Sequence, residues 1–541
     1  MRKARIVRIE KECATSTGNR CDIVTLYSGG QYSLYQYKKY TDVRLVFAPE
    51  FSIAQFGGDP DNFTYPRYCL DFSLFRAYEN GKPVSTPDYL AWSHTGVKDG
   101  ELTFVSGNPG STGRLQTIAQ MQFSRDVSYH MILTMLKEKI DALLAFSAKS
   151  VENKRVAQDY LDEAQNSYKA YSGFLAGLKD PKLMDRKRAE ERKLRAAIDD
   201  DPEKKKKFGK VWDELTDAYK EYATFFKPYY LLEALGGNSE MFSIARTVIR
   251  YAEEKPKPDE KRLSGYQDAG LPSLEQQMYS PAPLNNAVEE LVLAQQFHAF
   301  QENLGRNDAT VIAVLAGRTP EEAAHFYVST SKLQDVAERK RLANSVDAVK
   351  NSEDGMIRLA LILDGPARSY LKQFEDKVEA VITSSAAKIA QARFSVYGAN
   401  EYPDATFTPR LSYGPVKGYT DSAGKPVPYA TTFAGLYQRA TSKEPFALPP
   451  TWIKAKSALD LRTPFDFVTT ADTHGGNSGS PTVDTKGEII GILFDGNLEG
   501  LPNRYVYTEE QARSVHVSSN AIIEALKKVY RANRVLKELG F

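Results

Sequence analysis

Two kinds of hydrophobic pattern divide the chain. Over residues 21–112, β-branched and aromatic residues form short runs separated by Gly-Gly and Asn-Gly turns, which is typical of strands and hairpins. Over residues 115–397, apolar residues recur every three or four positions, as in amphipathic helices. The β pattern returns over residues 402–507 with many Gly and Pro, and a closing helix is predicted over residues 518–539.

This order predicts an α+β protein in which one β domain is interrupted by a helical insert. The predicted parts are residues 1–114, the first part of the β domain; residues 115–400, the helical insert; and residues 401–541, the second part of the β domain. Within the insert, Asp180-Pro181 is expected to end one helix, and the Pro-rich stretch 255–283 to separate two groups of helices.

Composition narrows the class of protein. With 541 residues, the chain is longer than one core normally accommodates. A formal net charge of +2 gives no argument for a nucleic-acid partner, and no apolar run approaches the roughly 20 residues that span a bilayer. We therefore expect neither nucleic-acid binding nor membrane insertion.

A glycine-rich serine loop lies near the end of the chain. Residues 475–481 read Gly-Gly-Asn-Ser-Gly-Ser-Pro and lie between two predicted strands, residues 465–470 and 488–494. Glycines on both sides of Ser478 let the backbone adopt positive φ and turn its amides inward. The amides of Gly476 and Ser478 could then converge beside the Ser478 hydroxyl, where an acyl-transfer oxyanion would be held. The alternative is a tight Gly/Ser turn joining two core strands.

A serine nucleophile needs a base, and the base usually needs an acid that orients it. Asp71 is the candidate acid, because it begins the predicted strand 72–78 after a segment rich in turn formers and aromatic residues. The alternative for Asp71 is an aspartate that caps the strand.

No histidine precedes Asp71. The six histidines of the chain are His94, His130, His298, His325, His474 and His516. Three of them lie in the predicted insert. A loop role is expected for His94, and a packing role for His516. His474 is four residues before Ser478 on the same loop, which makes it a poor general base, since a triad histidine normally reaches the serine from another strand.

The cysteines and histidines predict neither a metal site nor a cofactor. The histidines are scattered, no cysteine pair has zinc spacing, and no Gly-rich phosphate loop is present. Cys13 and Cys21 flank a loop-like stretch and could form a disulfide, which would suit an exported protein and add roughly 2–4 kcal/mol; two reduced thiols are the open alternative. Cys69 is expected to be buried.

Four motifs in one order resemble a known family. They are Asp61-Asn62-Phe63-Thr64-Tyr65-Pro66-Arg67, Asp71-Phe72-Ser73, the serine loop and Phe494-Asp495-Gly496-Asn497. Together they are similar to the bacterial dipeptidyl peptidases of serine peptidase family 46, of types 7 and 11, over essentially the whole chain. The resemblance implies a chymotrypsin-like double β-barrel with a helical domain inserted between its halves, no cofactor, a periplasmic or secreted location and a homodimer.

The resemblance also assigns catalytic roles. It makes Ser478 the nucleophile, Asp71 the triad aspartate, and the amides of Gly476 and Ser478 the oxyanion hole. The family's catalytic histidine lies upstream of the aspartate, in a part of the first lobe that has no counterpart in this sequence. The simplest interpretation is that the sequence lacks its N-terminal segment, which leaves the first lobe incomplete and its strand edges exposed, so that poor solubility is expected.

Substrate recognition is assigned in the same way. Asn62, Phe63 and Asp495 are implied to hold the free α-ammonium of a peptide. Family members usually have Trp at the position of Phe63; Phe keeps the apolar wall but loses the indole N–H donor. Gly496 occupies the position where acidic-specific members have arginine, so we expect a preference for an apolar residue before the scissile bond.

Three functions remain open at this point. The leading hypothesis is a serine-type dipeptidyl peptidase that releases dipeptides from the free N-terminus of peptides. The second is a serine endopeptidase resembling the glutamyl endopeptidases, which share Gly-Asn-Ser-Gly-Ser-Pro; the long insert and the Asn62/Asp495 pair argue against it. The third is an inactive peptide-binding homologue that keeps Ser478 and Asp71 but has no base.

Overall fold

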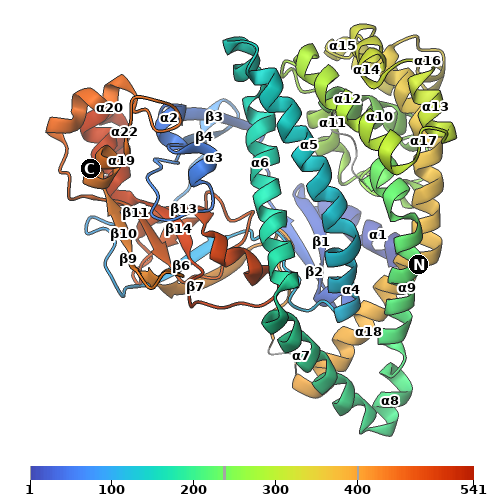
Figure 1. The fold of residues 1–541 in the computed structure, drawn as a ribbon, viewed down its shortest axis with the longest axis horizontal. Coiled ribbons are helices and arrows are strands. Elements are labelled where there is room, and N and C mark those ends of the chain that lie inside the picture. Colours follow the sequence, from blue (N-terminus) through green and yellow to red (C-terminus); the bar gives the residue numbers. More distant parts are fainter. Residues whose placement is uncertain (1, 235–238, 399–400) are drawn as a thin grey trace. The chain divides into compact units, whose positions relative to one another are not determined.

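The computed structural model describes residues 2–234, 239–398 and 401–541 (Figure 1). The chain forms two compact units, and each is built from several separate segments. The first unit contains residues 1–38, 117–168 and 187–401, and the second contains residues 39–116, 169–186 and 402–541.

The first unit is mainly helical. Its elements are α1 (Arg2–Thr17), β1 (Arg20–Leu26), β2 (Gln31–Tyr37), α4 (Ile118–Phe123), α5 (Tyr129–Ser147), α6 (Val151–Lys179), α7 (Pro181–Asp199), α8 (Pro202–Phe208), α9 (Val211–Tyr229), α10 (Glu240–Glu254), α11 (Leu271–Met278), α12 (Asn286–Asn303), α13 (Ala309–Leu315), α14 (Pro320–Ser329), α15 (Val336–Ala343), α16 (Val346–Lys350), α17 (Gly355–Phe374) and α18 (Ala380–Tyr397). The ends of α6 and α7 that flank Asp180 belong to the second unit.

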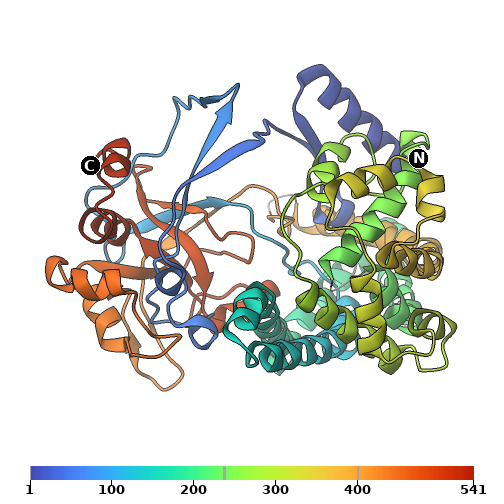
Figure 2. The same cartoon turned by 90° about the horizontal axis from the view of Figure 1, so that it is seen from above.

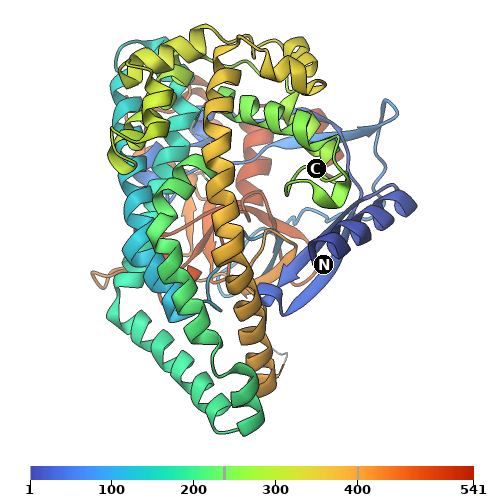
Figure 3. The same ribbon diagram turned by 90° about the vertical axis from the view of Figure 1, so that its right-hand side faces the viewer.

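Side-chain caps set the boundaries of several of these helices. Ser239 accepts a hydrogen bond from the Phe242 amide at the start of α10, and Asp354 accepts one from the Ile357 amide at the start of α17. As predicted, α6 ends just before Asp180-Pro181. The long helices α9, α17 and α18 pack together (Figure 3), and α10, α12, α14 and α17 enclose the largest apolar core of the unit.

The second unit contains the remaining strands and six short α-helices among its described residues. They are β3 (Asp42–Phe47), α2 (Phe51–Ala54), α3 (Gly58–Asp61), β4 (Leu74–Glu79), β5 (Lys82–Pro83), β6 (Leu102–Gly107), β7 (Arg410–Pro415), β8 (Tyr419–Thr420), β9 (Pro426–Val427), β10 (Ala430–Thr432), α19 (Phe433–Arg439), α20 (Pro450–Ala455), β11 (Pro464–Thr469), β12 (Pro481–Val483), β13 (Ile489–Gly496), β14 (Ser514–Ser518), α21 (Ser519–Glu524) and α22 (Asn533–Glu538), together with the short helical turns Lys456–Ala458, Leu498–Arg504 and Ala525–Val529.

Six antiparallel strands of this unit close into a barrel. Their order is β11-β14-β13-β12-β6-β7, with β10 added beside β11. The barrel closes because Val416, directly after β7, forms an antiparallel bridge with Thr469 of β11, and the Thr470 amide donates to the Pro415 carbonyl at 3.1 Å. Strands from before and after the helical insert therefore build one barrel.

A separate three-stranded sheet, β3-β4-β5, forms a ribbon that extends away from the barrel strands (Figure 2). Leu45 lies opposite Phe75, and Val43 lies two positions along on the same face. These three side chains are 54–61% exposed (Val43 54%, Leu45 61%, Phe75 60%). The sheet therefore presents an uncovered apolar face, a feature that favours association.

The division into units differs from the sequence-based boundaries at two places. Residues 1–38 join the helical unit because the β1–β2 hairpin packs on α18, where the rings of Tyr27 and Phe394 lie 4.9 Å apart. Residues 169–186 join the β unit because Gly173 and Gly177 lie on one face of α6 and pack closely on residues 501 and 502. A Cβ on Gly173 would lie 2.4 Å from Leu501 Cδ1, and a Cβ on Gly177 would lie 3.1 Å from Pro502 Cβ.

The closing helix is also interrupted. The sequence predicted one helix over residues 518–539, whereas α21 is followed by a short π-helical turn and the chain then restarts at α22. Arg531 between them has φ +51°, a left-handed conformation that no continuous α-helix contains. Among the described residues, no helix is both long and apolar enough to cross a membrane.

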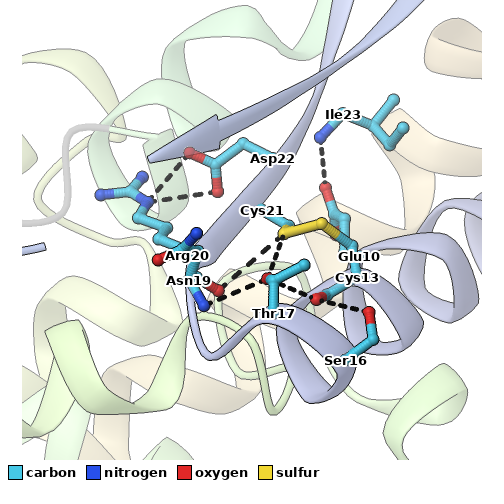
Figure 4. Close-up of a disulfide and its surroundings, with 9 residues drawn as sticks. All are labelled: Glu10, Cys13, Ser16, Thr17, Asn19, Arg20, Cys21, Asp22 and Ile23. Atoms are coloured by element: carbon cyan, nitrogen blue, oxygen red, sulfur yellow. Dashed lines mark hydrogen bonds and ion pairs between the residues drawn. A yellow bond between two sulfur atoms is a disulfide. The ribbon is translucent and has the colours of Figure 1, made fainter. Parts of the chain in front are cut away.

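Cys13 of α1 and Cys21 of β1 form a disulfide (Figure 4), while Cys69 is a buried free thiol, as predicted. The bridge lies beside a compact turn in which the Thr17 hydroxyl donates to the Cys13 carbonyl at 2.7 Å and accepts from the Asn19 amide at 3.2 Å. Of the two alternatives left open by the sequence, the structure therefore has the bonded one.

Replacing both bridged cysteines by serine is expected to loosen α1. An eight-residue separation corresponds to about 2–3 kcal/mol in the loop-entropy treatment. No residue of α1 is fully buried, and its other polar contacts include the exposed ion pairs Lys3–Glu375 and Lys11–Asp268. Amide hydrogen exchange in α1 and β1 should accelerate, while exchange in α9 and α17 stays unchanged. Wild-type protein under reducing conditions is the matched control, and unchanged exchange in α1 in both samples would contradict the expectation.

Candidate active site

Ser478 lies on a tight loop between β11 and β12 of the barrel. The loop is fastened by its own buried asparagine: the Asn477 amide donates to the His474 carbonyl at 2.9 Å, and the His474 amide donates back to Asn477 Oδ1 at 3.1 Å. The Ser480 amide donates to the Asn477 carbonyl at 2.9 Å. Asn477 is 1% exposed, whereas Ser478 is exposed. The loop therefore holds the serine at the surface of a rigid turn.

The amides of Gly476 and of Ser478 itself are available to bind a ligand. Gly476 has φ +106°, and neither its N–H nor that of Ser478 has an acceptor in the described part of the chain. The Ser478 hydroxyl donates to the Phe494 carbonyl at 3.3 Å, so it lies against the neighbouring strand β13. Two unpartnered amides beside a serine hydroxyl form the arrangement that stabilises a developing oxyanion.

Close packing explains why position 476 must be glycine. A Cβ at Gly476 would lie 2.7 Å from the Asn108 carbonyl oxygen and 2.8 Å from the Gly110 amide nitrogen. The Gly110 amide donates to the Gly475 carbonyl at 2.7 Å. The turn after β6 therefore fits directly against the serine loop and fixes its conformation.

Asp71 lies before β4 in an exposed position, and among the described residues no hydrogen bond reaches its carboxylate. Although its surface is accessible, surrounding protein raises the pKa of Asp71 by removing hydration; the Arg67 guanidinium opposes this shift and the Asp495 carboxylate adds to it. The structure thus places Asp71 in the field of Arg67 and Asp495, but it shows no group that links Asp71 to Ser478.

None of the six histidines forms a hydrogen bond with Ser478 or Asp71 in the described structure. His94 is exposed and packs on Phe541 at 4.6 Å between ring centroids. His298 and His325 pair with Glu321 and Glu290 in the helical unit, where the exposed His130 also lies.

The two histidines of the barrel are held in their neutral form. Burial, followed by the Arg114 guanidinium, lowers the pKa of His474 to about 4. Burial alone lowers the pKa of His516 to about 3. Both ring nitrogens of His516 form hydrogen bonds: Nδ1 with the Thr482 hydroxyl at 2.7 Å and Nε2 with the Thr469 hydroxyl at 3.0 Å. His516 is therefore a core residue.

The predicted N-terminus-binding residues come together around a buried ion pair. Asp495 Oδ2 accepts from Arg67 Nη1 at 2.5 Å and from the Phe63 amide at 3.0 Å, and both charged side chains are at most 7% exposed. Asp495 Oδ1 accepts from the Gly496 amide at 2.8 Å. Phe63 has φ +59°, a strained conformation for an aromatic residue, and this conformation aims its amide at Asp495.

The carbonyls and carboxylates next to Asn62 are also bound. Lys169 of α6 pairs with Asp59 at 2.9 Å and donates to the Asn62 carbonyl at 3.4 Å. Asp61 is 2% exposed and pairs with Arg439. The backbone around Asn62 and Phe63 is therefore fixed by side chains of α6 and α19, and the Arg67–Asp495 ion pair lies beside it.

Gly496 follows Asp495 on β13. A Cβ there would have one close neighbour, the Arg513 carbonyl oxygen at 3.4 Å, so the position has room for a side chain. The Arg513 guanidinium donates to the Lys417 carbonyl at 2.8 Å and the Gly418 carbonyl at 2.7 Å, and is occupied by the backbone.

Two residues of the site were missed by sequence reasoning. Arg67 is the last residue of the motif 61–67, but the sequence assigned it no role, because its partner Asp495 lies 428 residues further along the chain. Asp466 of β11 is fully buried; its Oδ2 accepts from the Cys69 amide at 2.8 Å and its Oδ1 has no partner among the described residues. A carboxylate in the middle of the apolar run 465–468 was the signal that could have found Asp466.

Replacing Asp466 by Asn is expected to flatten the dependence of stability on pH. Burial raises the pKa of Asp466 well above its usual value, despite the opposing Cys69 amide and Arg67, so the folded protein keeps a proton that the unfolded chain releases above about pH 4. The stability that comes from the protonated Asp466 is fully present below the pKa of this group in the unfolded chain, and it is lost as pH rises toward its pKa in the folded protein. Urea unfolding at pH 5 and pH 8 should therefore show a smaller loss of stability in Asp466→Asn than in wild type; an equal loss would contradict the expectation.

Comparison with known protein families identifies the class to which this chain belongs. The chain matches the family model described as Peptidase S46 over residues 1–541. It therefore belongs to this family, and it is a serine-peptidase hydrolase by membership, which confirms the resemblance inferred from the motifs.

The similar proteins carry more particular names. An Asp/Glu-specific dipeptidyl-peptidase of Shewanella putrefaciens is 27% identical over 579 residues, which cover 98% of this chain and 78% of that protein. Dipeptidyl-peptidase 7 of Porphyromonas endodontalis is 28% identical over 556 residues, which cover 96% of this chain and 65% of that protein. The crystal structure of Porphyromonas endodontalis DPP11 in complex with the dipeptide Arg-Glu matches with a TM-score of 0.77 at 23% identity, over 98% of this chain and 79% of that one.

This likeness confirms the α+β class with a large helical domain, and the relatives support dipeptidyl-peptidase activity as the coarse assignment. The comparisons do not support the expected preference for an apolar residue before the scissile bond, since relatives named Asp/Glu-specific are among the matches.

Proposed function

We propose that this chain is a dipeptidyl peptidase in which Ser478 attacks the second peptide bond from a free N-terminus. The observation that carries the proposal is the arrangement on β13: the Phe494 carbonyl accepts from Ser478, and the next residue, Asp495, presents a carboxylate. A dipeptide unit spans about 7 Å, so an anion one residue along the strand from the serine contact limits how much chain fits before the scissile bond.

The electrostatics support an ammonium ligand at Asp495. Its carboxylate accepts three hydrogen bonds, from Arg67, Phe63 and Gly496, out of about four that a carboxylate can accept. One position on Oδ1 therefore remains for a donor. Asp71 adds a second negative charge beside the single positive charge of Arg67, which favours a cation at this place.

Other features are part of the same proposal. We propose that the β3-β4-β5 sheet belongs to the first lobe of a double barrel. We also propose a periplasmic or secreted location, which the Cys13–Cys21 disulfide supports. A homodimer is proposed from the family resemblance alone.

The experiment compares three substrates and one variant. Fluorogenic dipeptidyl amides with a free N-terminus, their N-acetyl forms and a longer blocked peptide are offered to the chain and to Ser478→Ala, and both hydrolysis and binding are measured. Ser478-dependent release from the free form alone supports the peptidase. Because no histidine hydrogen-bonds to the Ser478 hydroxyl among the described residues, binding of the free form without release would identify a peptide-binding homologue. Cleavage of the blocked peptide would instead identify an endopeptidase and overturn the proposal.

The apolar preference stays in the proposal on the basis of Gly496. We expect Gly496→Arg to move the binding preference toward Asp or Glu at the second residue by about 10- to 100-fold, since a new guanidinium beside the substrate carboxylate forms a charge-assisted pair. Gly496→Gln supplies length without charge and is the matched control. A wild-type preference for Asp or Glu in a dipeptide panel would show the interpretation of Gly496 to be wrong.

A further inference from the structure

Phe407, in the segment before β7, is an exposed aromatic residue in a strained conformation. Its side chain is 68% exposed and its φ is +55°. A left-handed conformation costs a residue with a Cβ roughly 1–2 kcal/mol, and an exposed phenyl ring contributes little burial in return. The fold therefore holds Phe407 in place at a cost that core packing does not explain.

The backbone around Phe407 is fixed to the turn after β6. The Phe407 amide donates to both the Pro109 and Gly110 carbonyls at 2.9 Å. Thr406 forms an antiparallel bridge with Ser111, and the Thr406 and Thr408 hydroxyls lie 3.0 Å apart. Phe407 is thus presented on a rigid support, as a preorganised binding residue needs to be.

The ring lies against the nucleophile loop. A Cβ on Gly476 would lie 3.0 Å from Phe407 Cε1, and a Cβ on Gly110 would lie 3.0 Å from Phe407 Cζ. The backbone of Gly476, one of the two unpartnered amides, therefore has the Phe407 ring as its neighbour on one side. Ser478 itself has a different neighbour, strand β13, through the Phe494 carbonyl.

These two neighbours define two sides of the serine. The proposed function, on which this step rests, puts the N-terminal dipeptide along β13 toward Asp495. The part of the peptide beyond the scissile bond must then leave Ser478 on the opposite side, across Gly476. The side chain that follows the scissile bond meets the exposed face of Phe407 there.

We propose that Phe407 forms a subsite for the third residue of the substrate and selects peptides with an aromatic or large aliphatic side chain at that position. The ring supplies apolar and aromatic contact area, and its fixed backbone keeps the entropic cost of binding low. Phe407 contacts the substrate in this proposal and determines specificity; it takes no part in proton transfer.

The test measures binding to Ser478→Ala, so that cleavage does not interfere. Two tripeptide amides with the same first two residues and Phe or Gly in third place are titrated by calorimetry, each with a free and an acetylated N-terminus. We expect the Phe peptide to bind about tenfold more tightly than the Gly peptide. Phe407→Asn, which tolerates the left-handed conformation without a ring, should reduce this ratio to within about twofold.

Tyr413 provides the matched control, because it is equally exposed at 68% but lies along β7 against Phe104. Tyr413→Asn should leave the ratio unchanged. Equal ratios in wild-type and Phe407→Asn backgrounds overturn the subsite, as does failure of every peptide to bind. Loss of discrimination between free and acetylated N-termini, with the Phe407 effect retained, overturns the proposed function and leaves the subsite standing.

Discussion

Asp495→Asn is expected to destabilise the β unit by about 3–5 kcal/mol and to abolish the preference for a free N-terminus. The variant leaves the Arg67 guanidinium, which is 4% exposed, buried beside a neutral group, and an uncompensated buried charge is among the costliest single changes in a protein. In the proposed function, the same change also removes the anion that binds the substrate ammonium. Urea unfolding and titration with free and acetylated dipeptides measure the two effects separately.

A double-mutant cycle separates the ion pair from its surroundings. Arg67→Met alone should also be destabilising, since it leaves Asp495 without its cation, whereas Arg67→Met combined with Asp495→Leu removes both charges and should recover much of the lost stability. Strictly additive losses would mean that the two side chains do not stabilise each other, and the pair would then have no part in organising the site.

Gly476→Ala is expected to reduce affinity for a dipeptidyl aldehyde, which mimics the oxyanion, by about 10²- to 10³-fold, the range found when an oxyanion donor is lost. The new methyl group would meet the Asn108 carbonyl at 2.7 Å and the Gly110 amide at 2.8 Å, at a φ of +106° that L-residues avoid. The loop must therefore move and turn its amides away from the ligand.

Gly479→Ala is the control for this change. Gly479 also has positive φ, +85°, but nothing lies within 4 Å of a Cβ at this position. It should show a strain of roughly 1–2 kcal/mol with little loss of aldehyde affinity. Equal losses in the two variants would mean that backbone strain, rather than contact with the turn after β6, controls the loop.

Local pattern was sufficient to predict most of the elements. The period of apolar residues predicted the helices of the insert, and Pro181 marked the break between α6 and α7. The unit boundaries were not predictable in this way, because they depend on contacts between distant segments. Gly173 and Gly177 look like weak points of a helix in the sequence, and their role as a close-packing face toward Leu501 and Pro502 becomes apparent in three dimensions.

The candidate site was predictable to the extent that its parts are local. The serine loop carries its own signal in its glycines. The Arg67–Asp495 ion pair has no such signal in the sequence, since each residue alone is an ordinary charged residue near a turn. The two side chains form a buried pair only in the folded structure. The role of Asp71 rests on family resemblance, because no described group connects it to Ser478.

The placement of β6 has a consequence for biosynthesis. This strand pairs with β7 and β12, and residues 108–409 separate it from the first of these partners. At cellular rates of translation, β6 waits on the order of 15 to 60 s for β7 to emerge. The helical segments can form in the meantime from contacts within themselves, so the barrel is assembled late and around an insert that is already folded. An emerging chain thus acquires the loop that carries Ser478 among its last structures, and during most of its synthesis the nascent protein lacks the barrel that supports this loop.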